Sequence, residues 1–275
     1  PCYSTPRIFP LTFIDRTDMT TFLDLTAPAV RALHPYIPGK PVSELEREYG
    51  VSNIIKLASN ENPLGAGPLA RKAMQEAAAD IGFYPDGGGF ALKEALARQH
   101  GVGIERITLG NGSNDVLVLL AEAFLTPDTE AVYSQYSFAV YPIAVQAVGA
   151  KAFVAPALPA DHDMPLGHDL DAMAALITPR TRLVFVANPN NPTGTWLDGA
   201  RLKAFIQSVP STALVVLDEA YFEYSRGVDC PDGAHWLNEF PNLVVVRTFS
   251  KAHGLAGLRV GYALSHPQAA EILNR

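Results

Sequence analysis

The hydrophobic positions of this chain follow two patterns that alternate along the sequence. Short continuous runs of valine and leucine, such as Arg182–Ala187 and Ala213–Leu217, are typical of strands covered on both faces. Longer segments between such runs carry apolar residues at helical spacing, as in Gly89–His100, where alanine and leucine form one face. The pattern therefore predicts strands and helices in alternation.

The predicted elements cover most of the sequence. Strands are expected at Ile107–Leu109, Ala131–Tyr133, Ala152–Ala155, Arg182–Ala187, Ala213–Leu217 and Leu243–Arg247. Helices are expected at Ser43–Tyr49, Leu69–Asp80, Gly89–His100, Asp115–Leu125, Ala139–Val148, Leu170–Ile177, Asp198–Ser208 and His266–Arg275. Alternation of this kind favours a mostly parallel sheet with helices on both faces, so the predicted fold class is α/β.

Composition indicates a globular chain and excludes several classes of protein. Of its 275 residues, 48% are hydrophobic and 18% are charged, enough for a sizeable core. The formal net charge is −7 without a Lys or Arg cluster, which argues against nucleic-acid binding. Apolar runs fall far short of the roughly 20 residues of a membrane helix, so no membrane association is expected. Cys2 and Cys230 are the only cysteines, which excludes a disulfide framework and favours a reducing, cytoplasmic location.

The two ends of the sequence have the features of cuts. The chain begins with Pro1 rather than Met, and residues 1–18 contain no apolar stretch of the signal-peptide type. We interpret residues 1–18 as upstream translation or the open end of a fragment, in which case Cys2 is foreign to the natural protein. At the other end, the predicted helix His266–Arg275 stops without a glycine cap, so more chain is expected after it.

Four loops that follow predicted strands contain unusual polar residues. Their position matters because ligands of open α/β sheets bind at the carboxyl ends of the strands. The loops are Gly110–Asp115 (GNGSND), Asn188–Gly194 (NPNNPTG), Asp218–Tyr221 (DEAY) and Thr248–Arg259 (TFSKAHGLAGLR). We expect any ligand site at this edge of the sheet.

The first two loops each allow two interpretations. Gly110–Asp115 opens a helix with two glycines, and the free N–H groups of such a helix start suit a phosphate. A plain capped helix start explains the same residues, and the third glycine of a dinucleotide-binding fingerprint is missing. Asn188–Gly194 is either an ordinary turn or a loop whose prolines hold an asparagine rigidly as a donor.

The other two loops carry a carboxylate and an amine. Asp218 directly follows an apolar strand, so its carboxylate is expected to be desolvated and to need a partner, although an N-cap role is an alternative. Tyr221 places a phenol nearby. Lys251 lies among small and apolar residues, with Ser250 beside it and Arg259 farther on. A surface lysine is the simpler interpretation, but a buried lysine has a lowered pKa, and Schiff-base chemistry requires a neutral amine.

Together these groups suit one cofactor, pyridoxal 5′-phosphate. In this interpretation Asp218 keeps the pyridine nitrogen protonated, so that the ring acts as an electron sink. Lys251 forms the Schiff base with the cofactor and then moves the substrate proton. Asn191 and Tyr221 hydrogen-bond the ring oxygen. The weak signals of the separate loops therefore combine into one predicted site.

The remaining polar candidates carry no separate chemistry. His162 and His168 lie in a polar loop without the Cys or Glu spacing of a zinc site, so no metal is expected. Cys230, in VDCPDG, is interpreted as a bystander. The sequence also lacks the G-x-S-x-G turn of serine hydrolases.

Several stretches of the chain form a specific combination. They are ASNENPLG (58–65), YPDGGGFALKEALA (84–97), GNGSND (110–115), NPNNPTGT (188–195), DEAYFEY (218–224) and SKAHGLAGLRVGY (250–262). In this order they resemble fold-type I pyridoxal-phosphate aminotransferases, and most closely histidinol-phosphate aminotransferases. The resemblance implies a large cofactor-binding domain over residues 67–275 and an N-terminal segment, residues 19–66, that belongs to the small domain and covers the active site. It also implies that the C-terminal portion of the small domain is absent.

The resemblance assigns roles to individual residues. It makes Lys251 the Schiff-base lysine and Asp218 the partner of the pyridine nitrogen, and with Tyr221 these are the expected catalytic residues. Asn191 and Tyr221 match the residues that bind the ring oxygen, and Phe138 matches the ring that stacks on the cofactor. The residues expected at the cofactor phosphate are Gly112, Ser113, Asn114, Ser250 and Arg259.

Further positions concern the partner subunit and the substrate. Tyr84 matches a residue that reaches the phosphate of the neighbouring subunit, so the resemblance implies a homodimer with shared active sites. Asn60–Pro63 matches a segment that folds over the substrate. His253 stands where relatives often carry Phe or Tyr, and we interpret it as a packing residue. The arginine that grips the substrate in the family belongs to the portion expected to be absent.

The activity implied by the resemblance is transamination of L-histidinol phosphate with 2-oxoglutarate. The products are imidazole acetol phosphate and L-glutamate, and the reaction is a step of histidine biosynthesis. An aromatic amino-acid aminotransferase shares nearly all of these motifs, and an amino-acid-phosphate decarboxylase shares the fold. A non-catalytic nucleotide-binding α/β module is disfavoured, because holding a nucleotide requires neither Lys251 nor Asp218.

Overall fold

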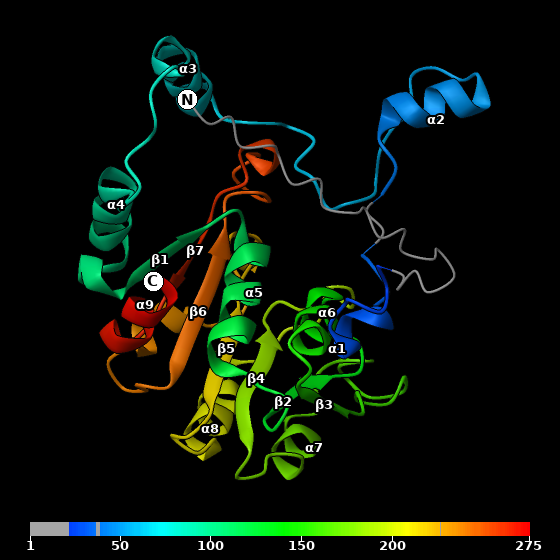
Figure 1. Ribbon diagram of the computed structural model, residues 1–275, viewed down its shortest axis with the longest axis vertical. Coiled ribbons are helices and arrows are strands. Elements are labelled where there is room, and N and C mark those ends of the chain that lie inside the picture. The colour runs from blue at the N-terminus through cyan, green and yellow to red at the C-terminus, as the bar shows by residue number, and fades with distance from the viewer. Residues whose placement is uncertain (1–21, 37–38, 226) are drawn as a thin grey trace, which may run out of the picture.

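The computed structural model describes residues 22–36, 39–225 and 227–275. The expected extension, residues 1–18 with Cys2, lies outside these ranges. The described strands form one seven-stranded sheet in the order β1-β7-β6-β5-β4-β2-β3 (Figure 1). The strands are β1 (Ile107–Gly110), β2 (Glu130–Ser134), β3 (Lys151–Ala155), β4 (Thr181–Ala187), β5 (Leu214–Asp218), β6 (Leu243–Thr248) and β7 (Gly261–Leu264).

Pairing in the sheet is mostly parallel, as the sequence predicts. β2 pairs in parallel with β3 and β4, β4 with β5, and β5 with β6. β7 is antiparallel to both β6 and β1, and the sequence patterns did not predict it. β7 lies between β6 and β1, and its first residue, Gly261, pairs with Gly110 at the end of β1. Gly261 therefore lies against the backbone of Ser113, the first residue of the helix that follows β1.

Helices cover both faces of the sheet (Figure 1). The α-helices of the described residues are α1 (Pro28–Arg31), α2 (Val42–Tyr49), α3 (Pro68–Ala77), α4 (Phe90–His100), α5 (Ser113–Phe124), α6 (Val140–Ala147), α7 (Leu170–Ala175), α8 (Gly199–Ser208) and α9 (Pro267–Leu273), and not all of them contact the sheet. One buried cluster joins the sheet to α4, α7 and α8, and a second joins it to α5, α6 and α9. The predicted α/β fold class is confirmed. None of the described helices combines the length and apolar character that crossing a bilayer requires.

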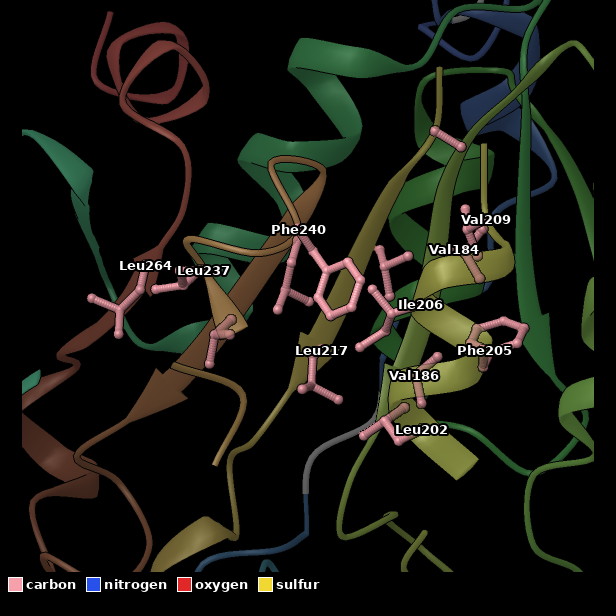
Figure 2. Packing of buried hydrophobic residues seen from close by; sticks show 14 of the residues in the cluster. Val184, Val186, Leu202, Phe205, Ile206, Val209, Leu217, Leu237, Phe240 and Leu264 are labelled. Atoms are coloured by element: carbon pink, nitrogen blue, oxygen red, sulfur yellow. The ribbon is translucent and has the colours of Figure 1, made fainter. Parts of the chain in front are cut away.

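Successive residues of the central strands face opposite layers. In β4, Val184 and Val186 belong to the cluster under α8, whereas Leu183 and Phe185 belong to the cluster under α5 and α6. Figure 2 shows the first of these layers, with Leu202 of α8 among the residues that pack there. Both faces are therefore apolar, which explains the continuous rather than alternating hydrophobic runs of the sequence.

The N-terminal part of the chain exposes many large apolar side chains. In Figure 1, α2 and α3 stand away from the sheet. The most exposed of these side chains are Phe22, Leu25, Ile55, Leu57, Leu64, Leu69, Ile81, Phe83 and Tyr84. These residues lie outside both buried clusters of the sheet.

Candidate active site

The loops after β4, β5 and β6 surround a cavity of about 320 Å³. It is lined by Tyr36, Ser59, Asn60, Ser113, Phe138, Ala187, Pro189, Asn191, Asp218, Ala220, Tyr221 and Lys251. The three strands are adjacent and parallel, so their carboxyl ends meet at one edge of the sheet. Residues far apart in the sequence therefore meet in one cavity, at the place that the sequence predicts.

Asp218 is the last residue of β5 and is 5% exposed. Its Oδ2 accepts a hydrogen bond from Tyr141 Oη at 2.7 Å, and its Oδ1 accepts one from the backbone N–H of Ala220 at 3.2 Å. Burial raises the pKa of this carboxyl, whereas the Tyr141 and Ala220 donors and the charge of Lys251 lower it. The carboxylate thus faces the cavity while two protein donors hold it.

The next residue, Glu219, faces the opposite side of the sheet. Its Oε2 forms an ion pair with Arg247 Nη2 at 2.6 Å, and its Oε1 accepts a hydrogen bond from the backbone N–H of Gly233. Arg247 also contacts Asp232 at 2.6 Å, and its guanidinium lies 3.9 Å from the centre of the Phe222 ring. Glu219 is committed to this buried cluster, so the DEAY motif offers only one carboxylate to the cavity.

Lys251 follows β6 and points toward the N-terminal segment. Its Nζ donates a hydrogen bond to the carbonyl oxygen of Ser59 at 2.8 Å. Burial lowers the pKa of the amine, and the positive charge of Arg259 acts in the same direction, whereas Glu61 and Asp218 oppose the shift. This direction favours the neutral amine, as expected for a lysine that forms a Schiff base.

Tyr221 is held by a residue of the same N-terminal segment. Asn60 Nδ2 donates to Tyr221 Oη at 2.8 Å, and burial raises the pKa of the phenol. Lys251 Nζ lies 5.9 Å from the centre of the Tyr221 ring. Two residues farther on, Asn62 Nδ2 donates to the carbonyl oxygen of Ala252 at 2.8 Å. The segment therefore lies against the loop that carries the lysine.

The three asparagines of NPNNPTG have different surroundings. Asn188 Oδ1 accepts a hydrogen bond from the backbone N–H of Leu197 at 2.7 Å, and Asn190 Nδ2 donates to the carbonyl oxygen of Tyr136 at 2.7 Å. Both asparagines are at most 3% exposed. Asn191 lines the cavity instead. The first two side chains hold the loop in shape, and the third is the one that can bind a ligand.

One end of the cavity is the N-terminus of α5. No side chain caps this helix, and its N-cap residue, Gly112, has a φ of 85°. Arg259 reaches the same point, where Nη2 donates to the carbonyl oxygen of Asn111 at 3.1 Å and Nη1 lies 3.4 Å from Ser250 Oγ. A Cβ atom on Gly112 would lie 2.4 Å from Arg259 Nη2. Uncapped N–H groups beside a guanidinium suit a phosphate dianion.

Comparison with protein families matches residues 52–275 to aminotransferase class I and II. The chain belongs to this family. A relative named histidinol-phosphate aminotransferase 2, from Pseudomonas fluorescens, is 57% identical over 256 residues, which are 92% of this chain and 68% of the relative. A second relative of that name, from Methylococcus capsulatus, is 55% identical and is covered to the same 68%. The resemblance to histidinol-phosphate aminotransferases is confirmed.

Solved structures of aminotransferases share this fold. The histidinol-phosphate aminotransferase of Sinorhizobium meliloti, in complex with pyridoxal 5′-phosphate, has a TM-score of 0.79 and 31% identity. The match covers 95% of this chain and 66% of that one. Aspartate aminotransferase from Thermus thermophilus, at 23% identity and a TM-score of 0.75, shares the fold. The fold-type I architecture is confirmed for a chain that spans about two thirds of the length of these relatives.

Within this member of the aminotransferase family, most of the residues expected at the site lie together. Those that line the cavity are Ser113, Phe138, Asn191, Asp218, Tyr221 and Lys251. Gly112, Ser250 and Arg259 surround the start of α5, and Asn114 is in the first turn of that helix. Tyr84 lies apart from them, fully exposed beside a separate surface hollow. The roles of these residues remain predictions.

Two aromatic residues of the site were missed by the sequence reasoning. Tyr141 reaches Asp218 from α6, and Tyr36 lines the cavity. The signal for Tyr141 was weak, since a lone tyrosine in the apolar helix VYPIAV fits a core position equally well. Nothing in the sequence around Tyr36 pointed to the site.

The histidines lie away from the cavity. His168 is 2% exposed, with Nε2 3.0 Å from the carbonyl oxygen of Ala187. His253 contacts the Phe249 ring, with 5.1 Å between ring centroids, and Glu223 Oε1 at 3.3 Å. Throughout the described ranges, no group of three His, Cys, Asp or Glu residues could hold a metal ion.

Proposed function

We propose that this chain is a pyridoxal-phosphate-dependent aminotransferase that transfers the amino group of L-histidinol phosphate to 2-oxoglutarate. The products would be imidazole acetol phosphate and L-glutamate. The observation that carries the chemistry is a single cavity containing the Lys251 amine, the buried Asp218 carboxylate and the start of α5. The substrate is supported by relatives that are named histidinol-phosphate aminotransferases, one of them 58% identical to this chain.

The charged groups of the cavity fit the two ends of this cofactor. The uncapped start of α5 and the guanidinium of Arg259 suit the phosphate. At the other end, Asp218 is a buried carboxylate whose hydrogen-bond donors, Tyr141 and Ala220, are both uncharged. Such a carboxylate favours a protonated ring nitrogen as its counter-ion. The site therefore matches both charges of the cofactor.

The remaining residues of the cavity fit the ring and the reacting atoms. When bound, the cofactor supplies an electron sink for negative charge that develops at the substrate Cα. Lys251 would hold the cofactor covalently at its aldehyde and, once displaced by the substrate amine, would move the proton of Cα. Tyr221 and Asn191 would donate to the ring oxygen, and Phe138 would cover the ring.

The functional unit in this proposal is a homodimer. Tyr84 is fully exposed outside the cavity of its own chain, and it lies in the N-terminal region where many apolar side chains are exposed. A second copy that covers this region would bury those side chains and could receive Tyr84 at its phosphate site.

The free, partly buried thiol of Cys230 suits the reducing cytoplasm.

The direct test is an absorbance spectrum of the purified chain with pyridoxal 5′-phosphate, before and after addition of L-histidinol phosphate. We expect a visible band that borohydride removes, with the cofactor then located on Lys251 by peptide mass spectrometry. L-Histidinol phosphate should bleach the band, and 2-oxoglutarate should restore it.

Other outcomes separate the alternatives. A higher kcat/KM for phenylalanine than for L-histidinol phosphate would indicate an aromatic amino-acid aminotransferase. Release of carbon dioxide from an amino-acid phosphate ester would indicate a decarboxylase. A chain that binds cofactor on a lysine other than Lys251 would contradict the proposed site.

A further inference from the structure

Tyr141 is a buried phenol behind the cavity. It is 0% exposed, and its Oη donates to Asp218 Oδ2 at 2.7 Å. The other carboxylate oxygen, Oδ1, accepts the backbone N–H of Ala220. Each oxygen of an ionised carboxylate can accept more than one hydrogen bond. Asp218 therefore has a protein donor on each oxygen and retains capacity for a donor in the cavity.

Neighbouring aromatic rings fix the position of the Tyr141 ring. Phe185 of β4 stacks on it, with 4.7 Å between ring centroids and 13° between ring planes. Phe138 meets it edge-on, at 6.0 Å and 87°. In a close-packed interior such a ring has little freedom to turn. Phe138, which also lines the cavity, joins this ring to the site.

The hydroxyl of Tyr141 stabilises the anionic form of a carboxyl whose pKa is raised by burial. The pKa of Asp218 is raised by burial, and the Tyr141 hydrogen bond is the largest of the effects that lower it. Glu219, the adjacent carboxylate, is paired with Arg247 on the other face of the sheet, so it cannot replace Asp218 as the anion of the cavity. Tyr141 is thus the side chain best placed to keep Asp218 ionised.

We propose that Tyr141 is a positioning residue that keeps the proton shared between Asp218 and the cofactor on the cofactor's ring nitrogen. With the phenol donating, Asp218 is the weaker base, and the ring nitrogen holds the proton. Without the phenol, the carboxylate becomes the stronger base, and the proton moves from the ring nitrogen to an oxygen of Asp218. The inference rests on the proposed cofactor and is independent of the proposed substrate.

The test compares Tyr141→Phe with Tyr133→Phe in the full chain loaded with pyridoxal phosphate labelled with ¹⁵N in the ring. Tyr133 belongs to the same aromatic cluster, 6.5 Å from Tyr141 between ring centroids, and is 6% exposed. In the described part of the chain its hydroxyl makes no hydrogen bond to Asp218. Both variants remove one hydroxyl from the same cluster, and Tyr141→Phe alone removes a hydrogen bond to Asp218.

We expect the nitrogen resonance of the original chain and of Tyr133→Phe at the protonated position, and that of Tyr141→Phe displaced toward the unprotonated position. The amount of cofactor fixed by borohydride should be equal in all three, while kcat should fall about tenfold or more in Tyr141→Phe alone. In chains that also carry Asp218→Asn, the nitrogen resonance should be the same whether residue 141 is tyrosine or phenylalanine.

Two results would overturn the inference. An unchanged nitrogen resonance in Tyr141→Phe would reduce Tyr141 to a packing residue, even if its kcat fell. Equal displacement in Tyr133→Phe would assign the effect to the cluster as a whole. By contrast, an original chain that shows only the resonance of free cofactor would overturn the proposed function, and this inference with it.

Discussion

The side-chain nitrogen of Lys251 is hydrogen-bonded to the carbonyl oxygen of Ser59, a residue 192 positions earlier in the chain. The next residue, Asn60, contacts Tyr221, and Asn62 contacts Ala252. One short segment thus touches the amine, the phenol and the backbone of the lysine loop. Its position gives the N-terminal region a direct influence on the reacting group.

Replacement of Lys251 by alanine should abolish covalent attachment of the cofactor and lower kcat by at least about a thousandfold, because no other amine among the described residues lines the cavity. Lys203→Ala is the matched control, since Lys203 pairs with Glu239 on the surface. Borohydride trapping followed by peptide mass spectrometry, together with turnover, gives the comparison. Normal turnover in Lys251→Ala would refute the assigned role.

Gly254→Ala should detach the N-terminal segment from the lysine loop. Gly254 has a φ of 66°, and a Cβ atom there would lie 2.2 Å from the carbonyl oxygen of Gly65, so the backbone must move. We expect faster tryptic cleavage after Lys56 and a lower kcat. Gly257→Ala, where an added Cβ meets no atom within 4 Å, should behave like the original chain. Equal cleavage of the two variants would show that the segment is not held at this contact.

Gly112→Ala should weaken cofactor binding about tenfold or more while the chain stays folded. The added Cβ would displace the guanidinium of Arg259, which is the mobile end of a flexible side chain. Gly101→Ala is the control, because Gly101 has a similar φ of 64° with no atom near the added Cβ. Gly101→Ala should lose about 1 kcal/mol in the free energy of unfolding, and Gly112→Ala more, because the φ of 85° and ψ of 167° at Gly112 are open essentially to glycine alone. Titration with pyridoxal phosphate separates them, and equal affinities would contradict a phosphate site at α5.

His168 should make the stability of the protein depend on pH. Burial lowers the pKa of its imidazole to about 4, whereas in the unfolded chain it is about 6.5. The unfolded chain therefore binds the proton more readily, and stability present above pH 6.5 is lost as the pH falls toward 4. The loss is about 3 kcal/mol at most.

Urea unfolding at pH 7.5 and pH 5 measures this dependence. His168→Gln should reduce the difference between the two pH values, because glutamine does not titrate and its amide can still donate to the carbonyl oxygen of Ala187. His162→Gln, at an exposed position, should retain the full difference. An unchanged difference in His168→Gln would mean that other groups carry the acid sensitivity.

Strands covered on both faces were the part of the fold that could be predicted best. β4 and β5 appeared as runs of apolar residues because their side chains enter two cores, and their bounds differ by at most one residue from the prediction. β7 was missed because its four residues follow a loop that contains glycines, and one of its two pairing partners, β1, is distant in sequence. Strand pairing of that kind has no local signal.

The same distinction applies to the site. Lys251, Asp218 and Asn191 belong to loops that directly follow predicted strands. The topology of a parallel sheet is therefore enough to predict that they lie at one edge. Ser59 reaches Lys251 through a backbone carbonyl, a group that every residue type carries, and no sequence pattern reports it. Tyr141 reaches Asp218 because its side of α6 faces the sheet. The sequence of α6 is apolar almost all round, so its pattern does not indicate which side is buried.

The hydrogen bond between Arg259 and the carbonyl oxygen of Asn111 joins positions 148 residues apart. On the ribosome, α5 emerges long before the loop that carries Arg259 and Lys251. A nascent chain thus has the start of the helix, but neither the cation beside it nor the amine that would retain an aldehyde. A nascent chain that has not yet reached Arg259 therefore has an incomplete cofactor site.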